Sequence, residues 1–189
     1  MVAITGASGV RLGIALLKEL SKHNNIHTHL IVSEWATKIL ESEEGISVKE
    51  LVDLAEHHYE NGNLMAPVAS GTFITNGMVI IPCSTGTLAA IANGIANDLI
   101  TRAASVTLKE KRKLVLVVRE TPLSPIHIEN MLRVSRGGAI ILPPVLTFHQ
   151  KPETIDDLVR FVVGKTLDVF QIEHHLFRRW SESKSDGSS

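Results

Sequence analysis

The chain has 189 residues, which is enough for one domain with a full hydrophobic core and short for two. Hydrophobic residues make up 44% and charged residues 21%, close to the globular average, so extensive disorder is not expected. The formal net charge of −1 indicates no polycationic face, and we therefore do not expect nucleic acid as a partner.

Cysteine content and the first residues bear on the compartment. The single cysteine, Cys83, cannot form an intrachain disulfide, which agrees with a reducing environment. The opening stretch, MVAITGASG, lacks the basic start and long apolar region of a signal peptide. No apolar run approaches the roughly 20 residues of a membrane-spanning helix. We therefore expect a cytoplasmic protein without a membrane partner.

Short apolar strands alternate with amphipathic helices along the chain. The pattern predicts a strand at 2–5, a helix at 12–23, a strand at 27–32, a helix at 35–42 with Ser33 as its N-cap, a helical stretch at 47–60, a long loop at 61–77, a strand at 78–82, a helix at 87–96, a strand at 113–118, a helix at 125–135, a strand at 138–142 and a helix at 154–170. This alternation predicts an α/β fold with a parallel sheet flanked by helices on both faces. We expect one domain over residues 1–180 and a disordered polar tail at 181–189.

Hydroxyl-rich or charged residues follow the predicted strands, at 5–9, 33, 83–87 and 119–122. The carboxyl ends of parallel strands lie at one edge of a sheet, which is where such sheets bind ligands. The sequence therefore predicts one site at this edge.

The first of these stretches, TGASG at 5–9, follows a strand and opens a helix. Its small residues would let backbone amides approach a phosphate at the helix N-terminus. However, Gly6, Gly9 and Gly13 do not have the G-x-G-x-x-G spacing, and the Walker lysine is absent. A phosphate loop and an ordinary tight turn remain alternatives.

The stretch IIPCSTGTLAAIA places Cys83 next to three hydroxyl residues. A cysteine nucleophile needs a neighbouring base or cation, and the local sequence supplies neither. We interpret Cys83 as core packing. Ser84, Thr85 and Thr87 are better interpreted as donors at a helix N-terminus that suit a flavin phosphate or ring carbonyl.

Other chemically active residues are less informative. The nine histidines contain no pair with convincing metal-ligand spacing, so we expect no metal site. The basic residues around Lys109 are typical of a solvated helix end. Glu120 follows a strand directly after Arg119, where it could act as an acid or base or merely pair with the arginine.

Five stretches together resemble the flavin prenyltransferases of the UbiX/Pad type. They are TGASG, LIVSEWA, ASGTF, the block PCSTGTLAAIANGIANDLITRAASVTLKEKRKLVLVVRETPLSPIHIENM and GAIILPPVLTFHQKPETIDDLV. The resemblance implies a Rossmann-like (flavodoxin-like) three-layer fold, assembled as a dodecamer with active sites at subunit junctions. It also implies a metal-independent reaction, in which a dimethylallyl group from dimethylallyl phosphate joins N5 and C6 of reduced FMN. The prenylated FMN would then serve a UbiD-type decarboxylase.

The resemblance also assigns roles to residues of this chain. It implies FMN binding by Gly6, Ala7, Ser8, Ser33, Ser84, Thr85, Gly86, Thr87 and Arg119. It implies binding of the prenyl phosphate by Ser70, Gly71, Arg102, Lys109, His149, Lys165 and Trp180. Catalytic roles fall to Glu120, Lys109, Ser8 and Glu43, with cations stabilising the leaving phosphate and Glu120 assisting proton movement.

Two departures from the family pattern affect the phosphate side. His149 stands where the family has tyrosine, and Lys165 stands where it has arginine, so the bidentate fork is lost. These changes predict an altered or weaker phosphate pocket, with a diphosphate donor as an alternative. They also leave open an FMN carrier or chaperone without transferase activity. A flavin-dependent cysteine decarboxylase is a further alternative, but its Pro-Ala-x-Asn-x motif is replaced here by APVASG at 66–71.

Overall fold

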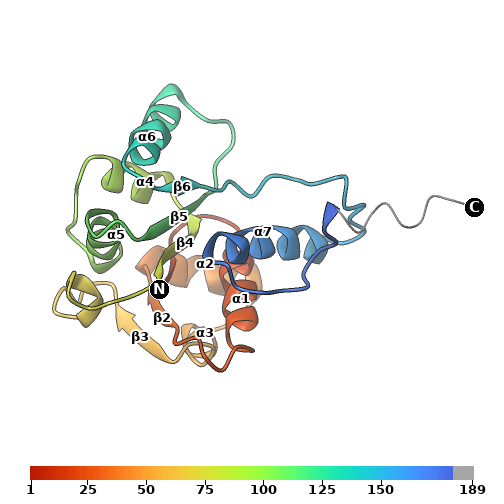
Figure 1. The fold of residues 1–189 in the computed structure, drawn as a ribbon, viewed down its shortest axis with the longest axis horizontal. Coiled ribbons are helices and arrows are strands. Elements are labelled where there is room, and N and C mark those ends of the chain that lie inside the picture. Colours follow the sequence, from red (N-terminus) through yellow and green to blue (C-terminus); the bar gives the residue numbers. More distant parts are fainter. Residues whose placement is uncertain (181–189) are drawn as a thin grey trace, which may run out of the picture. The chain divides into compact units, whose positions relative to one another are not determined.

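The computed structural model of the chain describes residues 1–180, so the tail predicted at 181–189 lies outside the described residues (Figure 1). The chain divides into two compact units, Met1–Pro144 and the part that begins at Val145. The expectation of one domain over residues 1–180 stays a prediction.

The first unit is built on a six-stranded sheet in which all neighbouring strands are parallel. The strands are β1 (Val2–Ile4), β2 (His29–Val32), β3 (His57–Glu60), β4 (Gly77–Cys83), β5 (Lys113–Val118) and β6 (Ile140–Ile141). Their order is β3-β2-β1-β4-β5-β6, which is the Rossmann order and confirms the predicted fold class. The order reverses between β1 and β4, so the loops after these two strands flank the switch point.

Helices cover both faces of this sheet. They are α1 (Val10–Leu20), α2 (Glu34–Glu44), α3 (Val48–Val52), the short 3-10 helix η1 (Pro67–Ala69), α4 (Thr85–Ala92), α5 (Leu99–Lys109) and α6 (Pro125–Arg136). Figure 1 shows α1 and α5 on opposite sides of the strands. A Cβ atom at Gly13 of α1 would lie 2.7 Å from both Ile4 Cδ1 and the Ile81 carbonyl oxygen, so glycine allows α1 to approach the sheet closely.

The predicted helical stretch at 47–60 is wrong in its second half, because residues 57–60 form β3. This strand is polar and largely exposed at the edge of the sheet, so it carries neither the alternation nor the apolar run of a buried strand. The helix predicted at 87–96 begins earlier, at Thr85, because Ser84 is its N-cap. The sequence pattern also did not delimit α5, although Asp98 and Thr101 form a capping box at its start.

The second unit contains α7 (Ile155–Phe170), preceded by residues 145–154 and followed by residues 171–180. Thr154 and Asp157 form the capping box that begins α7. None of the helices that the structure describes is long and apolar enough to cross a membrane.

Candidate active site

The ends of four neighbouring strands are tied together by backbone hydrogen bonds at the carboxyl edge of the sheet. The amide of Ser33, after β2, donates to the carbonyl of Ile4 in β1 at 3.0 Å. The amide of Arg119, after β5, donates to the carbonyl of Cys83 in β4 at 3.1 Å. The predicted convergence of the polar stretches at one edge is therefore confirmed for the loops after β1, β2, β4 and β5.

Thr5 links the two loops at the switch point, a role that its sequence pattern did not indicate. It is 1% exposed, and its hydroxyl donates to the carbonyl of Pro82 at 2.8 Å. The same hydroxyl accepts from the amide of Ser84 at 2.8 Å. Both hydrogen-bonding functions of this buried hydroxyl are satisfied, so it fixes the loop after β4 against the loop after β1.

The N-terminus of α4 presents the third hydroxyl-rich stretch. The Ser84 hydroxyl accepts from the Thr87 amide at 3.2 Å and lies 3.0 Å from the Thr87 hydroxyl. A Cβ atom at Gly86 would meet only the Ser84 hydroxyl, at 4.0 Å, so the surface beside this turn is open. The first amides of a helix have no intrahelical acceptor. This neutral set of amides and hydroxyls suits a phosphate group or ring carbonyls, so the residues present fit FMN.

Cys83 is a packing residue, as the sequence analysis predicted. Its side chain is fully buried in the core of the sheet, and burial raises the pKa of its thiol to about 12. A thiol with this pKa has almost no thiolate at neutral pH, so Cys83 is not a nucleophile.

The loop after β1 lies against the start of α2. Ser33 caps this helix by accepting from the Ala36 amide at 3.1 Å, as predicted. A Cβ atom at Gly6 would lie 2.5 Å from Trp35 Cβ, so only glycine fits there. Trp35 itself is 66% exposed and lies under the ammonium group of Lys38, 4.4 Å from the ring centroid. The sequence analysis did not single out this exposed aromatic residue beside Gly6.

Glu43, near the end of α2, binds the N-terminus of α1. Its Oε2 accepts from the Gly9 amide at 2.8 Å, and Gly9 is an N-cap with a φ of 95° and no capping side chain of its own. Partial burial would raise the pKa of Glu43, but hydrogen bonds from Ser8, Gly9 and Val10 lower it, with the positive charge of Arg119 adding to them. The structure thus brings Ser8, Glu43 and Arg119 together. Because the Gly9 amide already donates to this carboxylate, it is not available to a bound phosphate.

Glu120 lies at the same edge but does not pair with its neighbour. It is exposed, and its Oε1 accepts from the amide of Thr121 at 3.0 Å. In the part of the chain that the structure describes, no ion pair joins Glu120 to Arg119. Its carboxylate is therefore accessible, as an acid or base requires.

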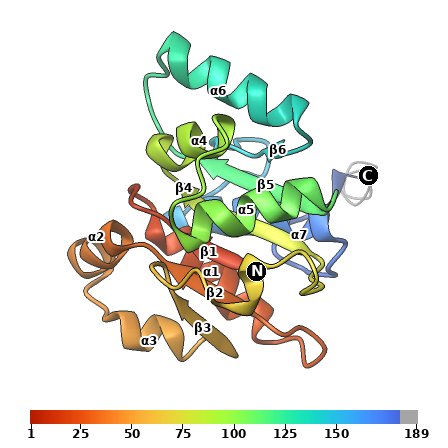
Figure 2. The same ribbon diagram turned by 90° about the vertical axis from the view of Figure 1, so that its left-hand side faces the viewer.

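The loop that carries Ser70 and Gly71 is held by basic side chains from α5 and the turn after it. Arg102 Nε donates to the carbonyl of Ala69 at 3.3 Å. Arg112 donates to the carbonyls of Gly71 and Phe73 at 2.7 and 2.8 Å. Arg112 is therefore an exception to the expected solvated helix end, because it anchors the loop. Figure 2 shows this loop, with η1, beside α5.

Lys109 lies over the same loop, at the last residue of α5, and pairs with Glu110. A Cβ atom at Gly71 would collide with both side chains of this pair. The start of β5, Lys113, pairs with Gly77, the first residue of β4, so Lys109 lies near the amino edge of the sheet.

Lys109 and Glu120 therefore lie at opposite edges of one sheet. The six residues of β5 separate them and span about 17 Å at roughly 3.3 Å per residue. A single copy of the chain does not bring these two predicted site residues together.

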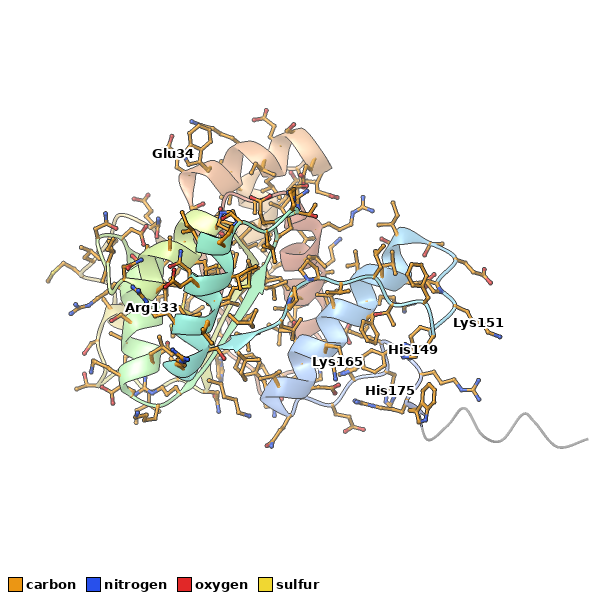
Figure 3. All side chains as sticks on the ribbon, turned by 90° about the horizontal axis from the view of Figure 1, so that it is seen from above. Glu34, Arg133, His149, Lys151, Lys165 and His175 are labelled. Carbon is orange, nitrogen blue, oxygen red and sulfur yellow. The ribbon has the colours of Figure 1, made fainter. Side chains whose placement is uncertain are left out.

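The remaining predicted phosphate ligands belong to the second unit. The His149 ring lies 5.9 Å from the rings of Phe161 and Trp180, measured between centroids. Lys165 Nζ lies 3.5 Å from Asp168 Oδ2. Figure 3 shows Lys165 on α7 and His149 in the segment before it. Among the described residues, no cluster of three or more His, Cys, Asp or Glu side chains could hold a metal ion.

Comparison with known proteins gives a consistent picture. The model of the Flavoprotein family matches residues 1–167. A protein of Escherichia coli O157:H7 named "Probable UbiX-like flavin prenyltransferase" is 48% identical over 180 residues, which cover 95% of this chain and 91% of that protein. The crystal structure of AnUbiX (PadA1) in complex with FMN and dimethylallyl pyrophosphate is 47% identical, with a TM-score of 0.92 and 95% of each chain covered.

A second solved structure is the dodecameric FMN-dependent UbiX-like decarboxylase of Escherichia coli O157:H7. It is 48% identical, with a TM-score of 0.92, and covers 95% of this chain and 99% of that one. The peptidyl-cysteine decarboxylase EpiD is only 17% identical, with a TM-score of 0.60, and shares the fold alone.

Proposed function

We propose that FMN binds at the carboxyl edge of the sheet and is prenylated there, because the chain belongs to the UbiX-like flavin prenyltransferases of the Flavoprotein family. The protein is a flavin prenyltransferase with FMN as its cofactor. The observation that carries the placement of the site is the row of hydrogen-bonded strand ends after β1, β2, β4 and β5.

Two loops and a helix N-terminus are proposed to hold FMN. The amides and hydroxyls of Ser84, Thr85, Gly86 and Thr87 would receive the phosphate, because the Gly9 amide is already bound to Glu43. The loop of Gly6, Ala7 and Ser8, together with Ser33 and Arg119, would lie along the flavin ring. When bound and reduced, FMN supplies the nucleophilic N5 and C6 atoms that accept the prenyl group.

The charged residues have separate roles in this proposal. Lys109 and Arg102 would stabilise the phosphate that leaves with the electrons of the carbon–oxygen bond. Glu120 would accept the proton released from the acceptor carbon. Ser8 and Glu43, which are hydrogen-bonded to each other, would form a second proton-transfer pair.

We propose that each site is shared between copies of the chain. Lys109 and Glu120 lie at opposite edges of the sheet, so the loop of Ser70 and Gly71 would serve the carboxyl edge of another copy. Met65 and Ile74 of this loop region are 92% and 85% exposed, as expected for a surface that a partner covers. A head-to-tail contact of this kind forms a ring where its rotation closes. The dodecamer of the Escherichia coli relative supports the same assembly for this chain.

The donor is proposed to be dimethylallyl phosphate, with the diphosphate as an alternative. AnUbiX was crystallised with dimethylallyl pyrophosphate, and His149 and Lys165 depart from the family pattern on the phosphate side. The product, prenylated FMN, would be passed to a UbiD-type decarboxylase.

The decisive experiment mixes the purified protein anaerobically with reduced FMN and either donor, then measures the mass of the extracted flavin. The expected result is a gain of one C5 unit, and the faster donor identifies the preferred phosphate. Unchanged FMN with both donors would contradict prenyl transfer and favour a carrier that binds FMN without modifying it. Oxidised FMN serves as the control, because it should bind without gaining mass.

A further inference from the structure

Asp168, in the last turn of α7, gathers three partners that the proposed function has not explained. Arg179 donates to its two carboxylate oxygens at 2.8 and 3.0 Å, a bidentate pair. His174 Nε2 lies 3.1 Å from Oδ1, and Lys165 Nζ lies 3.5 Å from Oδ2. All four residues belong to the second unit. One carboxylate therefore connects a proposed phosphate ligand to the segment at 171–180, here termed the carboxyl-terminal segment.

The ring of His174 lies between Asp168 and the backbone of the carboxyl-terminal segment. Its side chain is fully buried, and its Nδ1 accepts from the Leu176 amide at 3.2 Å. Its Nε2 lies 3.1 Å from Asp168 Oδ1 and 3.4 Å from a guanidinium nitrogen of Arg179. His174 therefore contributes to orienting the carboxylate beside Arg179.

Arg179 balances the negative charge of Asp168. Partial burial would raise the pKa of Asp168, but hydrogen bonds from Arg179 and His174, together with charge interactions with the same two residues, lower it. The carboxylate is thus ionised at neutral pH, and the bidentate guanidinium is its closer cation. Since Arg179 offsets Asp168, the positive charge of Lys165 remains available to an anion.

The carboxyl-terminal segment is also fitted to α7 by shape. A Cβ atom at Gly164 would lie 2.5 Å from Phe177 Cε1 and 2.7 Å from His174 Cε1, so glycine lets the segment lie against the helix. On its other side, Gln150 Nε2 donates to the carbonyl of Arg178 at 3.1 Å. Trp180 follows directly after these contacts, and its ring lies 5.9 Å from that of His149, measured between centroids.

We propose that Asp168 is a positioning residue for the prenyl-phosphate site. Its carboxylate holds the ammonium group of Lys165 and, through Arg179, fixes the segment that carries Trp180. The inference rests on the proposed function, because Lys165 and Trp180 are expected to bind the phosphate only if the chain transfers the prenyl group as its family resemblance implies. A lysine held before the ligand arrives loses less side-chain entropy on binding, so positioning strengthens affinity.

The test compares Asp168→Asn with Glu173→Gln, an exposed carboxylate of the same segment without a role in the proposal. The enzyme is loaded with oxidised FMN, which prevents turnover, and dimethylallyl phosphate is titrated by calorimetry. Asp168→Asn should raise the Kd for dimethylallyl phosphate about 10-fold, because the side chains of Lys165 and Arg179 would no longer be ordered before the ligand binds. Amide hydrogen exchange in residues 174–180 should increase, while FMN affinity and kcat with reduced FMN stay near the wild-type values. Glu173→Gln should match the wild type in every measurement.

A second variant tests the charge balance and does not depend on the stability of Asp168→Asn. Arg179→Gln leaves Asp168 to neutralise Lys165, so the Kd should rise. Adding Asp168→Asn to it should lower the Kd again, because Lys165 is then no longer neutralised by the unbalanced carboxylate. The proposal is overturned if Asp168→Asn behaves like Glu173→Gln, or if it lowers the Kd, which would make Asp168 a competitor of the phosphate. If the wild type binds the donor but does not prenylate FMN, only the proposed function fails, and these Kd values still decide the role of Asp168.

Discussion

The carboxylate of Glu43 accepts a hydrogen bond from the amide of Gly9 across two helices, at 2.8 Å. Gly9 begins α1 with a positive φ and has no capping side chain, so a residue from the end of α2 satisfies the helix instead. A carboxylate at this position also interacts favourably with the positive end of the helix dipole. One residue thus joins the stability of α1 to the loop that is proposed to lie along the flavin.

The first prediction concerns the pH dependence of this contact. Hydrogen bonds from Ser8 and the start of α1 lower the pKa of Glu43 in the folded chain. A carboxylate with a lowered pKa stabilises the fold above its unfolded pKa, and this stabilisation is lost as the pH falls through the folded value. Glu43→Gln should therefore lower the free energy of unfolding by about 0.5 kcal/mol at pH 7 and by almost nothing at about pH 3. Urea denaturation at both pH values measures the difference.

The matched control is Glu41→Gln, which removes an exposed carboxylate from the same helix. It should leave the free energy of unfolding close to the wild-type value at both pH values. An equal loss for Glu43→Gln at both pH values would show that the charge of Glu43 is not what stabilises α1.

The second prediction concerns Thr5, whose buried hydroxyl joins the loops after β1 and β4. Thr5→Val keeps the shape of the side chain but leaves the Ser84 amide without its partner, whereas the Pro82 carbonyl keeps only its hydrogen bond from the Thr5 amide. The cost should be about 1–3 kcal/mol of unfolding free energy. FMN affinity, measured by quenching of flavin fluorescence, should also fall, because Ser84 caps α4, whose N-terminus is proposed to bind the FMN phosphate. Thr5→Ser retains the hydroxyl and should restore much of both properties; if it is as damaging as valine, the hydroxyl is not the cause.

The third prediction concerns Gly6. An alanine Cβ there would lie 2.5 Å from Trp35 Cβ, an atom fixed by the backbone of α2, so the loop itself must move. Gly6→Ala should weaken FMN binding about 10-fold or more, because ligand atoms held by a displaced loop lose their hydrogen bonds. Gly62→Ala is the control, since a Cβ atom there has no neighbour within 4 Å. Equal FMN affinity in the two variants would show that the Gly6 loop does not contact the flavin.

The sequence predicted the residues at the carboxyl edge of the sheet correctly, because a residue's place at that edge depends only on its position directly after a strand. A polar residue directly after an apolar strand lies at that edge whatever the tertiary packing, which is why Ser33, Ser84 and Arg119 were placed correctly. The contact of Glu43 with Gly9 spans 34 positions in sequence and has no local signal. β3 was not predicted for a related reason. It is a strand because it pairs with β2, and its own polar sequence carries no strand pattern.

The position of Lys109 could have been inferred from the sequence. It comes just before a predicted strand, and a residue that leads into a strand lies at the amino edge of a parallel sheet. The role of Arg112 was less accessible, because its carbonyl partners lie 39 and 41 positions earlier. A charge run at a helix end does not reveal which of its members will anchor a distant loop.

The last prediction tests whether sites are shared between copies. Lys109→Ala should remove a cation from the leaving phosphate, and Glu120→Gln should keep FMN bound but block ring closure, so neither variant alone should form the ring-closed product. Lys109 and Glu120 lie at opposite edges of one sheet. If each site takes them from different copies, coexpression of the two variants creates some sites in which both residues are intact. Random mixing in a head-to-tail assembly would make about a quarter of the sites complete. Ring-closed prenylated FMN, separated by chromatography from the N5 adduct of equal mass and identified by its absorption spectrum, should therefore reappear at about a quarter of the wild-type rate. Mixed assemblies, verified by two affinity tags, that stay as inactive as either variant would show that one copy supplies both residues. The double variant coexpressed with an untagged copy of itself provides the inactive baseline.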